Sequence, residues 1–189
     1  MDFIWNDGGR SACGFVGLAG DCVTRSIAIA TGLVYRDVYQ QLGVESLGTP
    51  RNGVRTDIAA KYLKDRQWLH SRVSATPFTP STLPLGAVIV HLAKRDGRCS
   101  HFCAVIDHVV HDTWDPSSDE HFFVYSYWTH PNYGPGSDRL PTQGSKLDSA
   151  GQDLTQAEFD KILNRLRAMD RTASNCASSS PASPNLAPM

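Results

Sequence analysis

The sequence lacks the long apolar runs, the strong net charge and the regular cysteine spacing that mark several large classes of protein. No run approaches the roughly 20 apolar residues that a membrane-spanning helix needs. A formal net charge of −1 predicts no strong attraction to nucleic acid or to an anionic membrane. We therefore expect a small-molecule or protein partner, with no nucleic acid and no membrane, and the sequence leaves the oligomeric state open.

Cysteines are few, and they follow no disulfide framework. The N-terminus has no basic region followed by an apolar stretch, so we expect no secretory signal. Without export, the cysteines are expected to be free thiols in a reducing compartment, which predicts a cytoplasmic protein. They stand at Cys13, Cys22, Cys99, Cys103 and Cys176.

Helical patterns fill the first half of the chain, after a glycine-rich leader over 6–20 that we expect to be irregular. Asp21 suits the N-cap of a helix that starts at Cys22, and Gly32 suits its C-terminal stop. This helix is apolar on more than one side, which predicts a central, buried position. Two further helices are predicted over 35–42 and 54–68.

Strand patterns follow a turn-rich segment over 74–86. Short β-branched and aromatic runs predict strands, and Asp107-His108 predicts a tight hairpin turn. Helices followed by an antiparallel meander indicate the α+β class. The predicted strands cover 87–92, 100–106, 109–114 and 121–128.

The predicted domain covers residues 1–133, and order falls away after it. Residues 134–153 are expected to be a linker, and 154–170 an amphipathic helix. The Ser/Pro/Ala-rich segment 171–189 is expected to be a disordered tail.

Cys22 lies where a helix start favours a reactive thiolate. The unpaired N–H groups and the dipole at a helix N-terminus stabilise negative charge on sulfur and lower the thiol pKa. The same N–H groups can bind the oxyanion of a tetrahedral intermediate. The alternative is that Cys22 is a small buried hydrophobic residue. A partner histidine elsewhere in the chain favours the first interpretation.

His101 opens a predicted strand and suits the role of general base. With a two-residue turn in the hairpin, Asp112 lies on the same face of the sheet as His101, and Asp115 points away. A three-residue turn reverses this parity. We prefer Asp112 as the residue that orients the imidazole, and we keep Asp115 as the alternative. His121 also opens a strand and is the strongest rival base.

This arrangement resembles the papain-like cysteine hydrolases, a superfamily that includes papain-type proteases, double-glycine leader peptidases and cell-wall amidases. Gly20-Asp21-Cys22 resembles the Asp-Cys start of the leader peptidases. Asp112-Thr113-Trp114 is similar to the Asn-Ser-Trp of papain-type enzymes, whereas Asp115-Pro116 is similar to the Asp-Pro of the leader peptidases. The stretch from Asn6 to Gly32 also resembles a set of uncharacterised bacterial and phage proteins.

The resemblance implies a papain-like fold, in which the nucleophile stands on the first buried helix, and a thiol peptidase or amidase acting on a peptide or protein. It implies a Cys-His-Asp triad and an acyl-enzyme thioester, without metal or cofactor. The superfamily's oxyanion glutamine is missing, since Val16 and Gly17 stand at its usual positions. Asn6 is a candidate for that amide, although a turn beside Asp7-Gly8 is the alternative. The missing glutamine keeps open a catalytically inactive interaction module.

Two other patterns are weighed against these interpretations. A zinc site is disfavoured because structural zinc sites prefer Cys-x-x-Cys spacing, which this sequence does not have. Its ligands would be Cys22, Cys99, His101 and Cys103. The scattered arginines are expected on the solvated surface; they are Arg10, Arg25, Arg51, Arg55 and Arg72.

Overall fold

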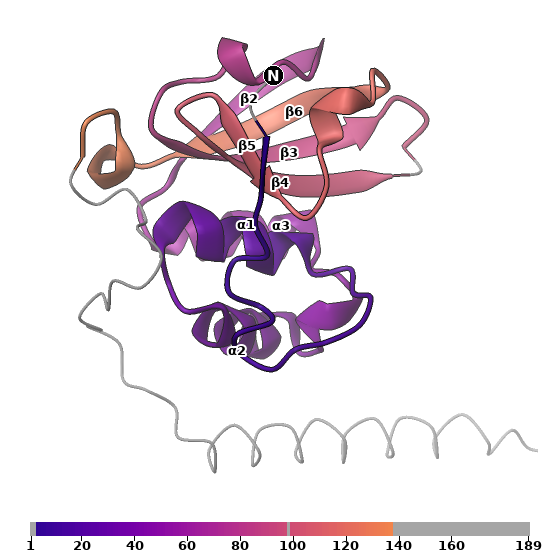
Figure 1. Cartoon of the computed structure of the whole chain (residues 1–189), viewed down its shortest axis with the longest axis vertical. Coiled ribbons are helices and arrows are strands. Elements are labelled where there is room, and N and C mark those ends of the chain that lie inside the picture. The colour runs from indigo at the N-terminus through magenta and orange to yellow at the C-terminus, as the bar shows by residue number, and fades with distance from the viewer. Residues whose placement is uncertain (1–2, 98, 138–189) are drawn as a thin grey trace, which may run out of the picture. The chain divides into compact units, whose positions relative to one another are not determined.

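The computed structural model describes residues 3–97 and 99–137 (Figure 1). The described chain is α+β, with three α-helices and one mixed six-stranded sheet. No helix in this part of the chain is both long and apolar enough to cross a bilayer. The predicted helix over 154–170 and tail over 171–189 lie outside the described residues, as does the predicted linker from residue 138 onward.

The helices occupy the N-terminal half. The first, α1, is the buried helix that the sequence predicts: every residue after Cys22 is buried. It ends at Gly32, whose left-handed φ of 70° lets its N–H reach the carbonyl of Ala28. The second helix runs one turn beyond its predicted end, and the third is shorter than predicted. Their bounds are α1 Cys22–Thr31, α2 Tyr35–Ser46 and α3 Thr56–Asp65.

The strand order in the sheet is β1-β5-β4-β3-β6-β2. The predicted antiparallel meander is wrong in two respects. After β5 the chain crosses to the far side of β3, where β6 pairs antiparallel, and β1 pairs parallel to β5. Periodicity along a strand does not specify its neighbours. The bounds are β1 Phe3–Trp5, β2 Leu69–Pro77, β3 Ala87–Lys94, β4 Ser100–Ile106, β5 Val109–Asp112 and β6 Phe122–Thr129.

The two strands that the sequence did not predict, β1 and β2, are the edges of the sheet. Neither contains a fully buried residue. Edge strands need less apolar surface than central strands, and β2 is largely polar. The hydrophobic pattern is therefore weak where the sheet meets solvent.

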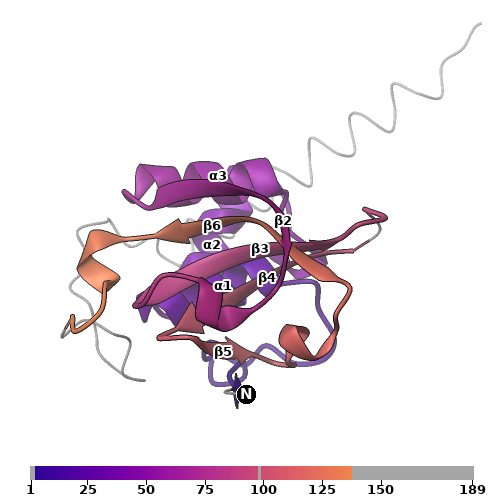
Figure 2. The same cartoon turned by 90° about the horizontal axis from the view of Figure 1, so that it is seen from above.

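The helices lie together on one face of the sheet (Figures 1 and 2). Helix α1 packs directly on β3, β4 and β5, and α2 packs against α1. Because side chains alternate along a strand, Ile89, Phe102 and Ala104 join the helical core. The intervening positions, such as Val90 and Cys103, form a second core on the other face. The sheet is thus buried on both faces, and α1 is held against its centre.

The leader that follows β1 crosses α1 closely. A Cβ atom on Gly8, whose φ is 66°, would lie 3.1 Å from the carbonyl oxygen of Arg25. Further along, the ring of Phe15 packs against Tyr35 and Tyr39 of α2, with centroid distances of 5.2 and 4.8 Å. The segment is irregular, as predicted, and these contacts fix its path over the helices.

Candidate active site

Cys22 is the first residue of α1 and is partly buried. Asp21 holds the N-cap position, as predicted, but its side chain makes no capping hydrogen bond. Its carboxylate instead accepts hydrogen bonds from Arg10, Arg25 and Tyr35. A capping carboxylate would occupy the first N–H groups of the helix. In this structure the Asp21 side chain leaves these N–H groups uncapped.

His101 lies on β4 and is 7% exposed. Its Nε2 lies 2.6 Å from Oδ2 of Asp112, at the end of β5. The other oxygen of Asp112 accepts hydrogen bonds from the backbone N–H of Thr113 at 2.7 Å and from Arg25 at 3.3 Å. Both carboxylate oxygens are therefore acceptors, and the imidazole is held in one orientation.

The hairpin turn places Asp112 rather than Asp115 beside the histidine. Asp107 and His108 have φ angles of 47° and 70°, and Ile106 pairs with Val109, so the turn has two residues. Asp112 consequently shares a face with His101.

Asp115 lies in the turn after β5. Its side chain accepts hydrogen bonds from the N–H of Ser117 at 2.9 Å and from the Ser117 hydroxyl at 2.6 Å. These bonds make Asp115 the start of the short turn that leads toward β6.

The thiol of Cys22 and the imidazole of His101 interact, because each contributes to the shift in the pKa of the other. Nε2 is bound to Asp112, so the ring nitrogen left for the sulfur is Nδ1. The backbone N–H of Phe102 also helps to lower the pKa of the thiol. Strand β5 pairs with Ala104–Ile106 of β4, so the first residues of β4, His101 included, have no residue of β5 paired beside them.

The electrostatics of the pair favour a thiolate and an imidazolium. Burial raises the pKa of Cys22, but its hydrogen bond to His101 and the nearby positive charges lower the pKa below its ordinary value. For His101, burial lowers the pKa, and the hydrogen bonds and charges of Asp112 and Cys22 raise the pKa to about 9. Both shifts favour the pair of a thiolate and an imidazolium over a neutral thiol and a neutral imidazole.

Aromatic rings screen the His101–Asp112 pair from water. The ring of Trp114 lies 5.0 Å from the imidazole, centroid to centroid, and the ring of Phe122 lies 6.4 Å from it. Trp114 is 39% exposed, so it forms the outer wall of this environment. A buried hydrogen bond between charged groups is stronger than an exposed one.

Asn6 lies next to Asp112 but is engaged in a turn. Its backbone N–H donates to the carbonyl of Asp112 at 2.8 Å, and its side-chain oxygen accepts from the N–H of Gly8 at 2.8 Å. Among the described residues, no hydrogen bond joins Asn6 to Cys22. This geometry favours the turn as the role of its side-chain oxygen.

The prediction that all the arginines lie on the solvated surface is wrong for Arg25, which is 8% exposed. It joins Asp21 to Asp112, and Arg10 joins the same cluster through Asp21. Sequence analysis missed this cluster because an arginine in a helix usually faces solvent. The available signal was Asp21, an acidic residue four positions before Arg25 in a helix that is otherwise mainly apolar.

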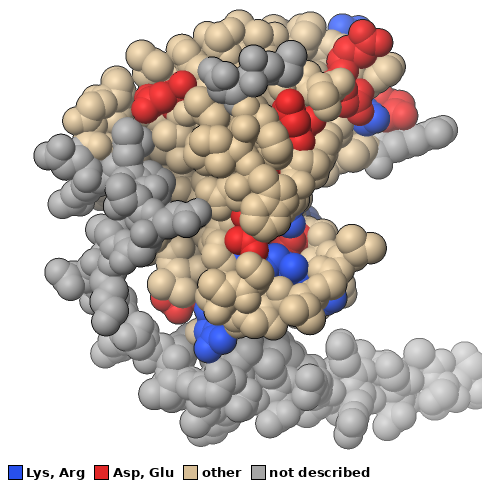
Figure 3. Space-filling view, in the orientation of Figure 1, with Lys and Arg blue, Asp and Glu red and all other residues tan. Residues whose placement is uncertain are grey.

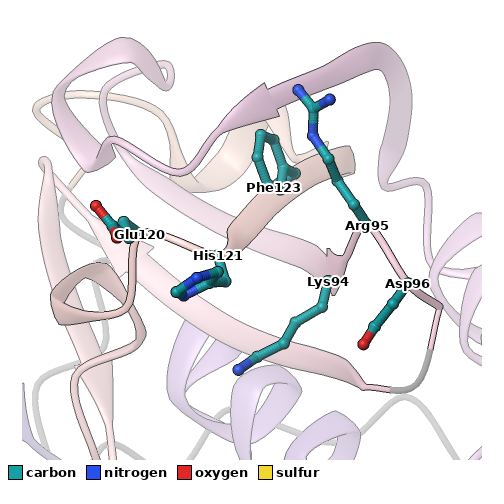
Figure 4. Close-up of a pocket in the computed structure, with 6 residues that line it drawn as sticks. All are labelled: Lys94, Arg95, Asp96, Glu120, His121 and Phe123. Carbon is teal, nitrogen blue, oxygen red and sulfur yellow. The ribbon is translucent and has the colours of Figure 1, made fainter.

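His121, the rival base, lines a separate cavity of about 380 Å³ (Figure 4). It has an acidic partner, since its Nδ1 lies 2.8 Å from Oδ1 of Asp119. None of the described residues that line the cavity is a cysteine, and they come from the end of β3 and the start of β6 with the segments beside them. The lining residues are Lys94, Arg95, Asp96, Glu120, His121 and Phe123.

Within residues 3–97 and 99–137, no three His, Cys, Asp or Glu side chains are grouped as metal ligands. Comparison with protein-family models, curated proteins and solved structures gives no match for this chain. The chemistry of the site is therefore inferred from the geometry of its residues.

Proposed function

We propose that this protein is a papain-like, cysteine-dependent hydrolase that acts on an amide bond of a peptide or protein. The observation that carries the proposal is that His101 interacts both with Asp112 and with Cys22, the first residue of a buried helix. His101 lowers the pKa of the Cys22 thiol, and its own Nε2 lies 2.6 Å from the Asp112 carboxylate. A nucleophile, its base and an orienting group are the parts that acyl transfer requires.

In the proposed reaction the Cys22 thiolate attacks the carbonyl carbon of the substrate, and the electron pair of the carbonyl moves to oxygen. Backbone N–H groups at the start of α1 stabilise this oxyanion. The His101 imidazolium gives its proton to the leaving nitrogen as the carbon–nitrogen bond breaks, leaving a thioester on Cys22. Neutral His101 then takes a proton from water, whose oxygen attacks the thioester and releases the acid.

Thiol alkylation tests the proposal without a known substrate. At about pH 6, where ordinary thiols are protonated, we expect iodoacetamide to modify Cys22 at least tenfold faster than Cys13, measured by peptide mass spectrometry. His101→Ala should abolish this difference, and His121→Ala, the matched control, should preserve it. Equal rates at Cys22 and Cys13 in the folded wild-type protein would refute the proposal.

A catalytically inactive interaction module is the second candidate, and it is favoured by one observation. The side-chain oxygen of Asn6 is used in a turn, so the superfamily's amide donor has no evident replacement. The two candidates differ in turnover with p-nitrophenyl acetate. An active enzyme is acetylated at Cys22 and then hydrolyses the thioester, whereas an inactive module keeps the acetyl group. Intact-protein mass spectrometry distinguishes the two outcomes.

The proposed setting is a reducing, cytoplasmic compartment. The four described cysteines, Cys13, Cys22, Cys99 and Cys103, are free thiols, as a thiolate enzyme requires. On the face drawn in Figure 3, acidic and basic side chains of the described residues lie intermingled. Mixed charge gives little attraction for a polyanion, which supports a peptide or protein substrate rather than nucleic acid.

A further inference from the structure

Arg25 connects the two ends of the proposed triad. Its Nη1 donates to Oδ1 of Asp21, and its Nη2 donates to Oδ1 of Asp112 at 3.3 Å. Asp21 directly precedes the nucleophile, and Asp112 orients the base. The three charged side chains are nearly inaccessible, with 8%, 1% and 2% exposure for Arg25, Asp21 and Asp112.

These contacts close a ring through the site. From Cys22 this closed path passes to His101 through their mutual effect on each other's pKa, and then to Asp112 by a side-chain hydrogen bond. It continues from Asp112 to Arg25 and from Arg25 to Asp21, and the peptide bond between Asp21 and Cys22 closes it. A rotation of either aspartate therefore disturbs the positions of the sulfur and the imidazole together.

Stability alone is a weak reason for this arrangement. Burying an ion pair costs about as much in lost hydration as it returns, and apolar residues often serve equally well. Within the described residues, Nε of Arg25 is buried without a hydrogen-bond partner, which adds a further cost. A guanidinium is nevertheless suited to hold two carboxylates at fixed angles, which an ammonium group cannot do.

We propose that Arg25 is a positioning residue for the Cys22–His101–Asp112 site. On one side it aims the Asp112 carboxylate at His101. On the other side it holds Asp21 away from the N–H groups at the start of α1, and its charge offsets that of Asp21 beside the thiolate. This inference rests on the proposed function.

The pH dependence of Cys22 alkylation tests the inference in the full chain. The positive charge of Arg25 helps to lower the pKa of Cys22, so Arg25→Met should slow alkylation at about pH 6 by roughly tenfold, as expected for a pKa rise of about one unit. Arg25→Lys keeps the charge but loses the two-sided geometry, and should slow alkylation at least threefold, by roughly half a pKa unit.

Arg51→Met is the matched control. Arg51 is exposed and donates to the carbonyl of Leu18, outside the site. The alkylation profile of this variant should equal that of the wild type. Cys103, which is 1% exposed, reports on folding in the same experiment because it reacts only when the core opens.

The two hypotheses fail in different ways. Fast Cys22 alkylation in the wild type and in both Arg25 variants, with Cys103 protected, would overturn the positioning role and leave the proposed function intact. Slow alkylation in the wild type would overturn both. Alkylation of Cys103 would reveal that Arg25→Met has unfolded. In that case the rate of Cys22 alkylation in Arg25→Lys is compared with the rate in Arg51→Met. A wild-type rate in Arg25→Lys overturns the inference.

Discussion

Nε2 of His101 and Oδ2 of Asp112 lie 2.6 Å apart on two strands that a two-residue turn connects. This contact fixes which ring nitrogen faces the thiol and which acid orients the base. Asp112 uses both of its oxygens as acceptors. A carboxylate can do this, whereas a side chain of the same shape with only one acceptor oxygen cannot.

The first prediction concerns that carboxylate. Asp112→Asn replaces one acceptor oxygen with an NH₂ group, which must face either His101 or the donors Arg25 and Thr113. We expect the free energy of unfolding to fall by about 3 kcal/mol, measured by urea denaturation, and Cys22 alkylation at about pH 6 to slow at least tenfold. Asp115→Asn keeps the oxygen that binds Ser117 and should match the wild type in both measurements. Wild-type behaviour of Asp112→Asn would show that the charge is dispensable.

The second prediction concerns the protonation of His101. Its pKa of about 9 lies above the ordinary value of 6.5, so the imidazolium should persist through neutral pH and lose its proton only as the pH rises through about 9. Histidine-selective ¹⁵N NMR titration measures this directly. Cys22→Ser removes a partner that raises the pKa, so the midpoint should move to lower pH. A wild-type midpoint near 6.5 would exclude the thiolate–imidazolium pair.

The third prediction assigns the role of Asn6. Asn6→Ser keeps a side-chain oxygen for the turn to Gly8 but removes the amide N–H. If the helix N–H groups hold the oxyanion, the rate of acetylation by p-nitrophenyl acetate should change little. Loss of an oxyanion donor lowers such rates about 100-fold or more. A decrease of that size would assign the Asn6 amide to the oxyanion hole.

The fourth prediction tests the close approach of the leader to α1. Gly8 and Gly9 have φ angles of 66° and 82°, but only a Cβ on Gly8 meets other atoms, with the Arg25 carbonyl at 3.1 Å. Gly9→Ala should lower the free energy of unfolding by about 1 kcal/mol through backbone strain alone. Gly8→Ala should lower the free energy of unfolding by clearly more than Gly9→Ala does in the same urea titration. Equal decreases would mean that the leader moves away from α1 without a further loss of stability.

Much of the local structure was predictable because it follows from short-range patterns. The start of α1 at Cys22, its end at Gly32, the bounds of β4 and the two-residue turn all follow from spacing and turn chemistry. The order of the strands did not follow, because β6 pairs with β3 across a connection whose sequence carries no pairing signal. The edge strands were also missed, since weak burial leaves a weak pattern.

The candidate site divides in the same way. The sequence by itself determined a cysteine at a helix start, a histidine that opens a strand and, through hairpin parity, Asp112 on the histidine's face of the sheet. Only the tertiary structure decided that Cys22 and His101 interact, that Asp115 belongs to a turn, and that Arg25 is buried between Asp21 and Asp112. Periodicity is set by neighbours along the chain, whereas burial and charge pairing depend on which distant segments pack together.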